Sequence, residues 1–286
     1  MRNKAYLYLL ITAFIWGITL PIAKPVFNYI NPFQFLYFRY LLASVLILPA
    51  LFYTLKRYQP NVKDIFIIIG FELIQVIALI LLYLGLERTS VIEASILGAT
   101  SPIFITLGGI IFLKEKQERK EWLGLFVSFM GALVLAFKPI NSFSGLGNLL
   151  ILAYLLVIAV YYLSAKYFYA DYPKVMVTGI SYLVALISIF LLNRSFGFAT
   201  DLSLLTQPTI LFVSLYMAIF ASIIAFTLYL KGQALIEVSE ASLFTYLQAI
   251  FALPAAYLIE GEIISAFQLF LVLIIAAGVF LAEKRV

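Results

Sequence analysis

Long apolar stretches separated by short polar connections run through the whole chain of 286 residues. A helix needs about 20 predominantly apolar residues to cross a bilayer. Ten stretches are candidates, and because they are continuous rather than alternating, they favour helices over barrel strands. They are Ala5–Ile22, Pro32–Leu55, Ile65–Leu86, Val91–Leu113, Trp122–Phe137, Leu146–Phe168, Val175–Leu192, Pro208–Leu230, Ala241–Ile259 and Ile264–Ala282. The pattern predicts an all-α polytopic membrane protein with ten transmembrane helices.

The sequence repeats itself at two related offsets. In the later spans of each half the offset is 147 residues and pairs Gly85 with Gly232, Glu93 with Glu240, Ser95 with Ser242, Glu115 with Glu262 and Gly131 with Gly278. Near the front of each half the offset is 142 residues and pairs Lys24 with Lys166 and Tyr40 with Tyr182. We therefore expect two repeats, residues 1–141 and 142–286, with five spans each. An odd number of spans makes the second repeat inverted, which is typical of secondary transporters.

The basic residues indicate an orientation. Of the 19 Lys and Arg residues, 14 fall in connections on one side of the expected bundle and 4 on the other, with Arg39 inside a span. The positive-inside rule places the more basic side in the cytoplasm. The chain is therefore expected to be a multi-pass protein of a prokaryotic-type plasma (inner) membrane, with both termini cytoplasmic.

Composition excludes several classes of function. The chain is 64% hydrophobic and 12% charged, against roughly 45–50% and about 25% in globular domains. It has no Cys and no His, which excludes disulfides, thiolate or imidazole metal sites and histidine-based triads. No P-loop pattern is present. The net charge of +5 comes without the basic–aromatic patch of a nucleic-acid site. We expect no enzyme, no cofactor, no metal and no nucleic-acid partner.

Motifs in the first half resemble those of a known family. They are Phe14-Ile15-Trp16-Gly17, Phe38-Arg39-Tyr40-Leu41, Tyr83-Leu84-Gly85, Ser101-Pro102-Ile103-Phe104 and Trp122-Leu123-Gly124. The chain resembles the drug/metabolite transporter (DMT) superfamily, specifically its EamA-type members, over essentially its whole length. The resemblance implies a ten-helix transporter, often an exporter of amino acids or related small molecules. It also implies a central cavity between the first, third, fourth, sixth, eighth and ninth helices.

Polar and aromatic residues near the middle of the spans form the expected substrate pocket. The candidates are Trp16, Thr19, Gln75, Tyr83, Ser95, Ser101, Tyr161, Tyr162, Ser222, Tyr246 and Gln248. Glu72 joins them as an acidic residue well inside the third span, where a charge needs a partner or a water-filled cavity. For Glu72 a proton or cation site, a partner for a substrate amine and a structural pair all stay open.

Three residues receive structural roles. A structural pair is favoured for Arg39, because the resemblance places the second helix outside the cavity. Pro102 and Pro254 remove backbone hydrogen bonds, so each predicts either a hinge or a static kink.

Other functions stay open beside the transport of small metabolites by alternating access. The alternative is a flippase for a lipid or lipid-linked substrate, which predicts polar residues along a groove that opens to the bilayer. A channel is disfavoured, since the chain has no ring of like charges and no repeated filter sequence. Energy coupling is undecided between facilitated diffusion and proton exchange.

Overall fold

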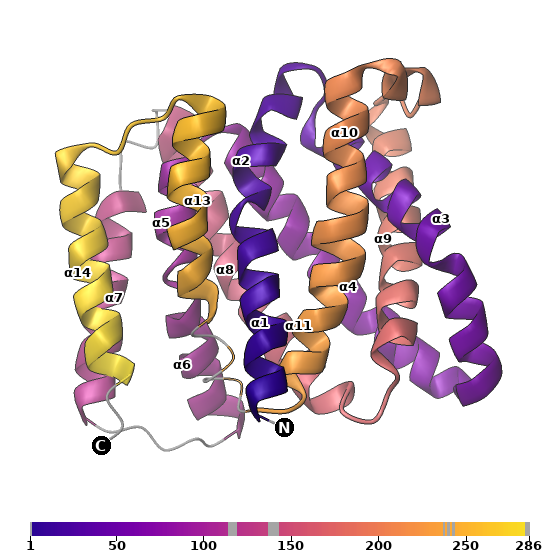
Figure 1. Ribbon diagram of the computed structural model, residues 1–286, viewed down its shortest axis with the longest axis horizontal. Helices are drawn as coiled ribbons and strands as arrows, with labels where there is room; N and C mark the ends of the chain where they lie inside the picture. Colours follow the sequence, from indigo (N-terminus) through magenta and orange to yellow (C-terminus); the bar gives the residue numbers. More distant parts are fainter. Residues whose placement is uncertain are drawn as a thin grey trace.

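The chain folds into a bundle of helices (Figure 1). The computed structural model describes residues 2–113, 119–136, 143–236, 238, 241 and 244–283, and in these ranges it contains no strand. The helices are α1 (Arg2–Gly17), α2 (Thr19–Ala23), α3 (Pro32–Tyr58), α4 (Val62–Glu87), α5 (Val91–Gly98), α6 (Ser101–Leu113), α7 (Arg119–Ala136), α8 (Phe143–Phe168), α9 (Lys174–Phe196), α10 (Pro208–Tyr216), α11 (Ala225–Gln233), α13 (Phe244–Glu260) and α14 (Ala266–Glu283). Two 3-10 segments, η1 (Lys24–Asn28) and η2 (Leu202–Thr206), and a π-helical segment, η3 (Met217–Ile224), join them.

Polar capping residues set the helix starts. Before α3, the Asn31 side chain accepts hydrogen bonds from the backbone of Phe33 and Gln34, and the Gln34 side chain accepts one from the Asn31 backbone. At α5, Ser90 Oγ accepts from the backbone N–H of Glu93 at 3.0 Å. These side chains satisfy amide groups that have no partner inside the helix. The polar residues Asn31 and Ser90 therefore determine where α3 and α5 begin.

In two of the expected spans the helix is interrupted a few residues before a proline. Pro21 cannot donate to the Gly17 carbonyl four residues earlier, and the first span divides at Ile18 into α1 and α2. Pro102 likewise cannot donate to Gly98, and the fourth span divides into α5 and α6. Pro254, in contrast, lies inside the continuous helix α13. The roles of Pro102 and Pro254 as hinges stay predictions.

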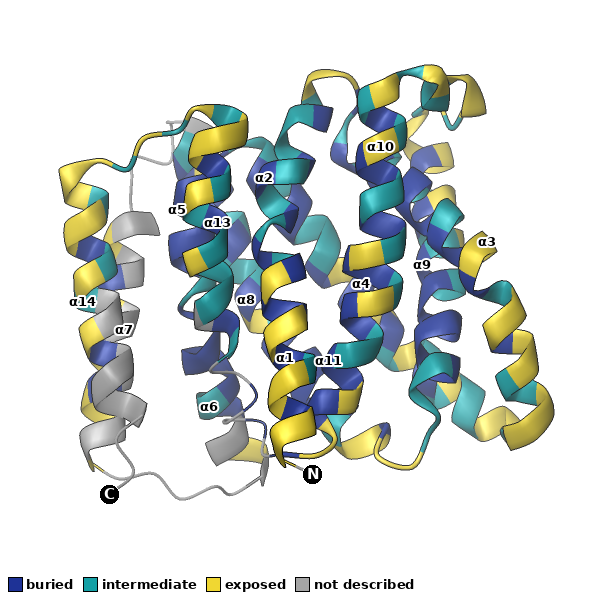
Figure 2. Cartoon of the chain, viewed as in Figure 1, coloured by how far each residue is buried: buried dark blue, intermediate teal, exposed yellow. Residues whose placement is uncertain are grey.

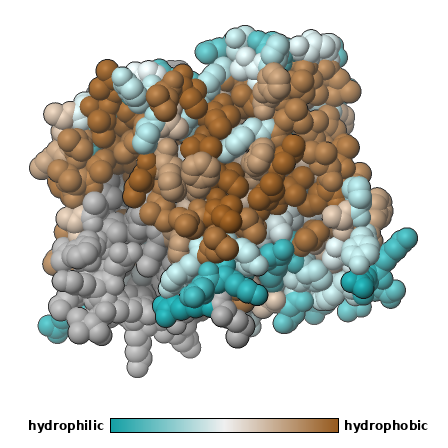
Figure 3. Space-filling view, in the orientation of Figure 1, coloured by the Kyte–Doolittle hydropathy of each residue, from teal (hydrophilic) through white to brown (hydrophobic). Residues whose placement is uncertain are grey.

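The outer surface of the bundle is apolar. Figure 2 shows exposed residues along the outward faces of α1, α3 and α14, and many of these are large hydrophobic residues. In Figure 3 a broad hydrophobic band crosses the face shown, with hydrophilic residues toward the upper and lower edges. Among the described residues, seven helical segments are long and apolar enough to cross a membrane. The prediction of an all-α polytopic membrane protein is confirmed.

Five helix pairs with extensive contacts each consist of one helix from the first half of the chain and one from the second. Helix α4 packs against α8, α3 against α9, α1 against α11, α5 against α13, and α7 against α14. In Figure 1, α7 and α14 lie at one edge of the bundle and α3 and α9 at the other. The start of α1 and the end of α14 lie at the same end of the bundle.

Two glycines make equivalent close approaches between helices. A Cβ atom added at Gly85 on α4 would lie 2.9 Å from the carbonyl oxygen of Gly147 on α8. A Cβ atom added at Gly232 on α11 would lie 3.3 Å from the carbonyl oxygen of Ala5 on α1. Gly232 follows Gly85 by 147 residues, and Gly147 follows Ala5 by 142 residues. The same contact is thus made twice, once by each half against the other.

Two lysines cap helix ends in the same way. Lys24 Nζ donates to the carbonyl oxygens of Leu86 and Thr89 at the end of α4. Lys166 Nζ donates to the carbonyl oxygens of Gln233 and Ile236 at the end of α11, each at 2.6 Å. The lysines are related by the 142-residue offset, and both pairs of acceptors by the 147-residue offset. The cations satisfy carbonyls that have no partner inside the helix and lie at its negative end.

Candidate functional site

A cavity of about 120 Å³ lies between the helices of both halves. Its wall comes from α1, α2, α4, α5, α6, α8, α11, α13 and η3, which belong to the spans that the family resemblance implied. Helices α3 and α9 also contribute, through Arg39, Tyr40 and Tyr182. The expectation that Arg39 lies away from the cavity is therefore corrected. Arg39, Tyr40 and Tyr182 have long side chains, which reach the cavity although the family resemblance did not place α3 and α9 around it.

The structure brings together most of the polar and aromatic residues that the sequence singled out. Those in the cavity wall are Trp16, Thr19, Gln75, Tyr83, Ser95, Ser101, Tyr162 and Gln248. Glu72, Tyr161 and Ser222 are buried behind the wall. The side chain of Tyr246 lies outside the described residues. A role for these residues in substrate binding stays a prediction.

Many positions in the wall are related by the two offsets of the repeat. They are Trp16 and Ile158, Leu20 and Tyr162, Tyr40 and Tyr182, Leu79 and Phe226, Gly98 and Thr245, and Ser101 and Gln248. Equivalent positions thus line the cavity, but most of them carry different residues. The fold places the wall symmetrically, while its chemistry differs between the two halves.

Trp16 is held against the eighth span. Its Nε1 donates to the carbonyl oxygen of Ala221 at 2.8 Å, and its ring lies 5.2 Å from that of Tyr229. Ala221 belongs to the π-helical segment η3, a backbone form that is often found at functional sites. Thr12 Oγ1 donates to Ala225 just beyond η3. These bonds fix α1, and with it the indole face, against η3 and α11.

Arg39 is a buried cation in the wall, with 6% of its surface exposed. Its Nε donates to Ser222 Oγ at 2.9 Å, and its Nη1 donates to Tyr83 Oη at 2.8 Å. The guanidinium carbon lies 5.3 Å from the ring centroid of Tyr40 and 5.8 Å from that of Tyr83. All of these partners are uncharged side chains, so the positive charge of Arg39 is held without being neutralised.

Glu72 is fully buried behind the wall, in a shell of hydroxyl groups. Its Oε1 accepts hydrogen bonds from Tyr161 Oη at 3.0 Å and from Tyr169 Oη at 2.8 Å. Its Oε2 lies 2.6 Å from Ser181 Oγ, which in turn lies 2.9 Å from Gln75 Oε1. Because Gln75 lines the cavity, Glu72 is linked to the wall through one serine.

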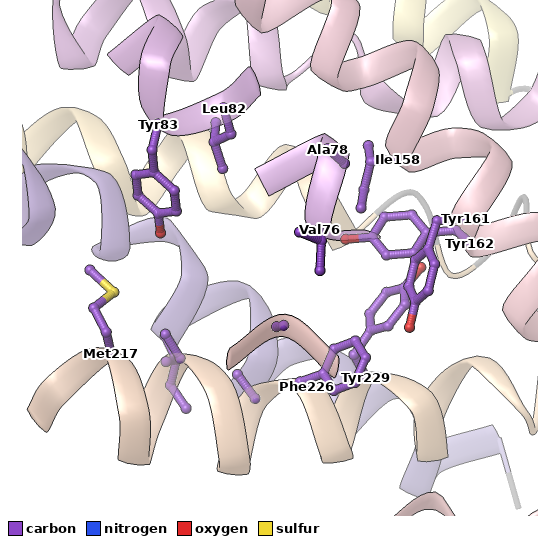
Figure 4. Close-up of a cluster of buried hydrophobic side chains, with 14 of the residues drawn as sticks. Val76, Ala78, Leu82, Tyr83, Ile158, Tyr161, Tyr162, Met217, Phe226 and Tyr229 are labelled. Carbon is purple, nitrogen blue, oxygen red and sulfur yellow. The ribbon is translucent and has the colours of Figure 1, made fainter. Parts of the chain in front are cut away.

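The sequence did not single out the whole aromatic lining. Tyr154 and Phe226 join Tyr162 and Trp16 in the wall. Figure 4 shows Tyr161, Tyr162, Phe226 and Tyr229 gathered on one side, with Tyr83 on the other. The spacing of Tyr154, Tyr161 and Tyr162, seven and eight residues apart on α8, places them on one helical face. That spacing was the available signal for Tyr154.

A bundle of lipid-facing helices around a polar and aromatic cavity defines a polytopic membrane protein that can hold a solute. The chain belongs to the EamA-like transporter family, whose model matches residues 3–137 and again residues 145–283. The expected family is therefore confirmed, and the protein is a multi-pass membrane transporter.

Several known sequences and a solved structure resemble the chain. An "uncharacterized transporter" of Archaeoglobus fulgidus is 26% identical over 295 residues, which cover 100% of this chain and 99% of that protein. The uncharacterized transporter YetK of Bacillus subtilis is 29% identical over 252 residues, covering 84% of this chain and 75% of YetK. A solved crystal structure matches with a TM-score of 0.72 at 16% identity, over 99% of this chain and 97% of the other. That structural match shows a shared fold.

Proposed function

We propose that the protein carries small metabolites, such as amino acids, out of the cell by alternating access around the central cavity. The observation that supports this most is the cavity itself, which is walled by both halves and lined with polar and aromatic groups. The hydroxyl of Ser95 in its wall has no hydrogen-bond partner among the described residues. A buried polar atom of this kind is costly unless a ligand or water satisfies it.

The backbone breaks support the same proposal. Gly17 and Gly98 line the cavity, and each is followed four residues later by a proline that cannot bond its carbonyl. Non-helical backbone at membrane depth is tolerated where it lines a cavity. Broken helices around a central site are typical of secondary transporters. The breaks offer both acceptors for a solute and points at which helices can bend.

The two halves are proposed to be inverted repeats, residues 1–141 and 142–286. The paired glycine contacts and the paired lysine caps support this, since each joins positions related by the two sequence offsets. The basic connections support a cytoplasmic position for both termini. The location of α1's start and α14's end at one end of the bundle is consistent with that orientation.

Proton exchange is the proposed form of coupling, through Glu72. Ser181 has one hydroxyl hydrogen but lies within hydrogen-bond distance of both Glu72 Oε2 and Gln75 Oε1. If Glu72 is ionised, Ser181 donates to it, and Gln75 turns its NH₂ group toward Ser181. If Glu72 is protonated, it donates to Ser181, which donates to Gln75 Oε1. When Glu72 is ionised, Gln75 therefore presents its oxygen, an acceptor, to the cavity. When Glu72 is protonated, Gln75 presents its NH₂ group, a donor.

Counterflow in proteoliposomes tests the function. The purified protein is reconstituted, and exchange of a panel of labelled amino acids is measured for the wild type, Trp16→Ala and Gln248→Ala. Phe66→Ala is the matched control, because Phe66 is 68% exposed on the outside of α4. Exchange by the wild type and the control, with loss in both cavity variants, is the expected result.

Two outcomes would change the proposal. Exchange that survives both cavity substitutions would move the binding site away from the cavity. Absence of exchange for all amino acids and related metabolites, together with lipid movement in a translocation assay, would favour the flippase. Both assays use the same reconstituted protein, so the two functions are compared directly.

A further inference from the structure

The cavity wall contains one ionised side chain whose charge has no counter-ion in the described structure. Arg39 makes its hydrogen bonds to Ser222 and Tyr83, which are uncharged. The ion pair between Arg88 and Glu87 involves neither Arg39 nor a residue of the cavity wall. None of the described residues that line the cavity is an Asp or a Glu. A buried cation of this kind is normally paired, because removing it from water is costly.

The two buried carboxylates of the described core are already satisfied by neutral groups. Glu72 accepts from two tyrosine hydroxyls and lies beside Ser181. Glu93 accepts a hydrogen bond from Asn148 Nδ2 at 2.8 Å and lies 3.2 Å from Thr89 Oγ1. Neither carboxylate forms an ion pair with Arg39. In the part of the chain that the structure describes, the two buried acids thus have donors, while the buried cation of the cavity wall has no anion.

Comparison of the two halves shows that the fold does not require a cation at this position. Arg39 is equivalent to Ser181 by the 142-residue offset, and Ser222 is equivalent to Gln75 by the 147-residue offset. The contact of Arg39 with Ser222 therefore has a counterpart in the contact of Ser181 with Gln75 at 2.9 Å. In the second half a neutral serine makes this helix-to-helix contact. Packing between the helices therefore does not require the positive charge of Arg39.

Arg39 also has donors to spare. A guanidinium carries five N–H groups in a planar fork, and the two hydrogen bonds to Ser222 and Tyr83 use two of them. The rings of Tyr40 and Tyr83 fix the orientation of the group. A planar fork of this kind matches the two oxygens of a carboxylate. The rest of the wall, with Trp16, Tyr162 and Phe226, suits an apolar or aromatic body.

We propose that Arg39 is the receptor for a carboxylate of the transported solute, so that the cavity selects small organic acids with an apolar or aromatic body over amines and neutral analogues. This assignment rests on the proposed transport function and specifies its substrate class. Amino acids satisfy it through their carboxylate. Amines do not, because the described part of the cavity wall offers no acidic side chain to pair with them and Arg39 repels them.

The test is a series of four ligands with the same aromatic body: 3-phenylpropanoate, phenylalanine, 2-phenylethylamine and 3-phenylpropan-1-ol. The chain has two tryptophans, and Trp122→Phe leaves Trp16 in the cavity wall as the sole tryptophan, which can be excited apart from the tyrosines. Dissociation constants are measured from Trp16 fluorescence in a neutral detergent. We expect both carboxylates to bind roughly 30-fold or more tightly than the amine and the alcohol.

Variants of Arg39 carry the test further. Arg39→Gln is expected to weaken both carboxylates by roughly 30-fold or more and to leave the alcohol unchanged. Arg39→Lys keeps the charge but loses the fork, so an intermediate loss is expected. Tyr83→Phe keeps the guanidinium and removes one of its hydrogen bonds, so a loss of only a few-fold is expected. The charge preference of the wild type needs no variant and stays measurable if Arg39→Gln fails to fold.

Three results of the binding titrations would overturn the assignment. They are equal binding of the amine and the carboxylates, carboxylate binding that is unchanged in Arg39→Gln, and no response to either carboxylate up to about 10 mM. Repeating the titration in nanodiscs with phosphatidylglycerol distinguishes a soluble acid from an anionic lipid headgroup, since a headgroup at Arg39 would compete with the carboxylates. Carboxylate binding without counterflow would overturn the transport proposal alone. Counterflow of amines in preference to acids would overturn the Arg39 assignment alone.

Discussion

Tyr40 and Tyr182 hold equivalent positions in the two halves of the chain, and their rings contact each other with centroids 5.7 Å apart. Both residues lie in the cavity wall. A residue contacts its own equivalent only close to a two-fold axis, as at an isologous interface. The pair therefore marks where the proposed axis between the halves passes. A solute in the cavity lies beside this axis and is in reach of both halves at once.

The lysine caps predict two matched losses of stability. Lys24→Met and Lys166→Met each remove the donor to carbonyls at a helix end, at α4 and α11 respectively. Unsatisfied buried carbonyls cost about 1–3 kcal/mol, so both variants should unfold at a lower temperature in detergent. Lys231→Met, at an exposed lysine on α11, is the control. Equal melting temperatures for the control and both cap variants would contradict the assigned role of the caps.

The close helix contacts predict different effects of adding one methyl group. Gly85→Ala places its Cβ 2.9 Å from the Gly147 carbonyl and 2.8 Å from Ile151 Cδ1, and should destabilise by about 1–3 kcal/mol. Gly70→Ala, on the same helix, meets nothing within 4 Å and should stabilise by up to about 1 kcal/mol. Thermal unfolding of the two variants measures the difference. A similar response at both positions would argue against the packing of α4 on α8.

Glu262 predicts a link between the second half and the start of α5. Its carboxylate accepts hydrogen bonds from the backbone N–H groups of Val91 at 2.8 Å and Ile92 at 2.9 Å. Glu262→Ala should therefore cost about 0.5–2 kcal/mol, the usual range for the loss of an N-terminal helix cap. Glu260→Ala is the control, since its carboxylate makes no hydrogen bond among the described residues. The expected result is a lower melting temperature for Glu262→Ala alone.

The proposed orientation predicts which loops a membrane-impermeant thiol reagent reaches. The chain has no Cys, so single substitutions report one position each. Gln59→Cys lies between α3 and α4 and is expected in the cytoplasm, whereas Ser203→Cys in η2 is expected outside. In intact cells only Ser203→Cys should be labelled, and both should be labelled after lysis. Labelling of both in intact cells would contradict the assigned topology.

The hydroxyl shell around Glu72 predicts a pH effect on flux. Glu72→Gln removes the proton that the carboxyl can bind but keeps one acceptor for the tyrosine hydroxyls. The rate of solute transport should therefore no longer change when a pH gradient is imposed. The solute should still exchange when the pH is equal on both sides. Counterflow with and without a gradient measures both quantities. Unchanged pH dependence in Glu72→Gln would dismiss Glu72 as the coupling group.

The fold was largely predictable because hydrophobicity sets it. Each of the ten apolar runs is helical over most of the residues that the structure describes, and the all-α membrane class follows from their length. The break at Ile18 was not foreseen, although Pro21 carried the signal for it. Pro254 lies inside the continuous helix α13, so a proline in an apolar run does not by itself show whether the helix divides.

The candidate site was predictable only in part, because depth in the membrane does not determine which way a side chain points. Trp16, Gln75 and Gln248 were placed in the pocket from their depth, and they line the cavity. Glu72 has a similar depth, yet its hydroxyl partners Tyr161 on α8 and Ser181 on α9 hold it behind the wall. Arg39 was assigned away from the cavity by its helix, but its long side chain reaches the wall. Such differences depend on tertiary contacts that no single span encodes.

The glycine contacts have a consequence for the origin of the chain. Gly85 packs against the second half, and its equivalent Gly232 packs against the first half. A five-span unit alone would therefore leave both of these close-packed faces exposed. If the halves are inverted as proposed, two copies inserted in opposite directions would cover both faces with one kind of contact made twice. The present bundle is then arranged as a dual-topology homodimer whose subunits have become one polypeptide.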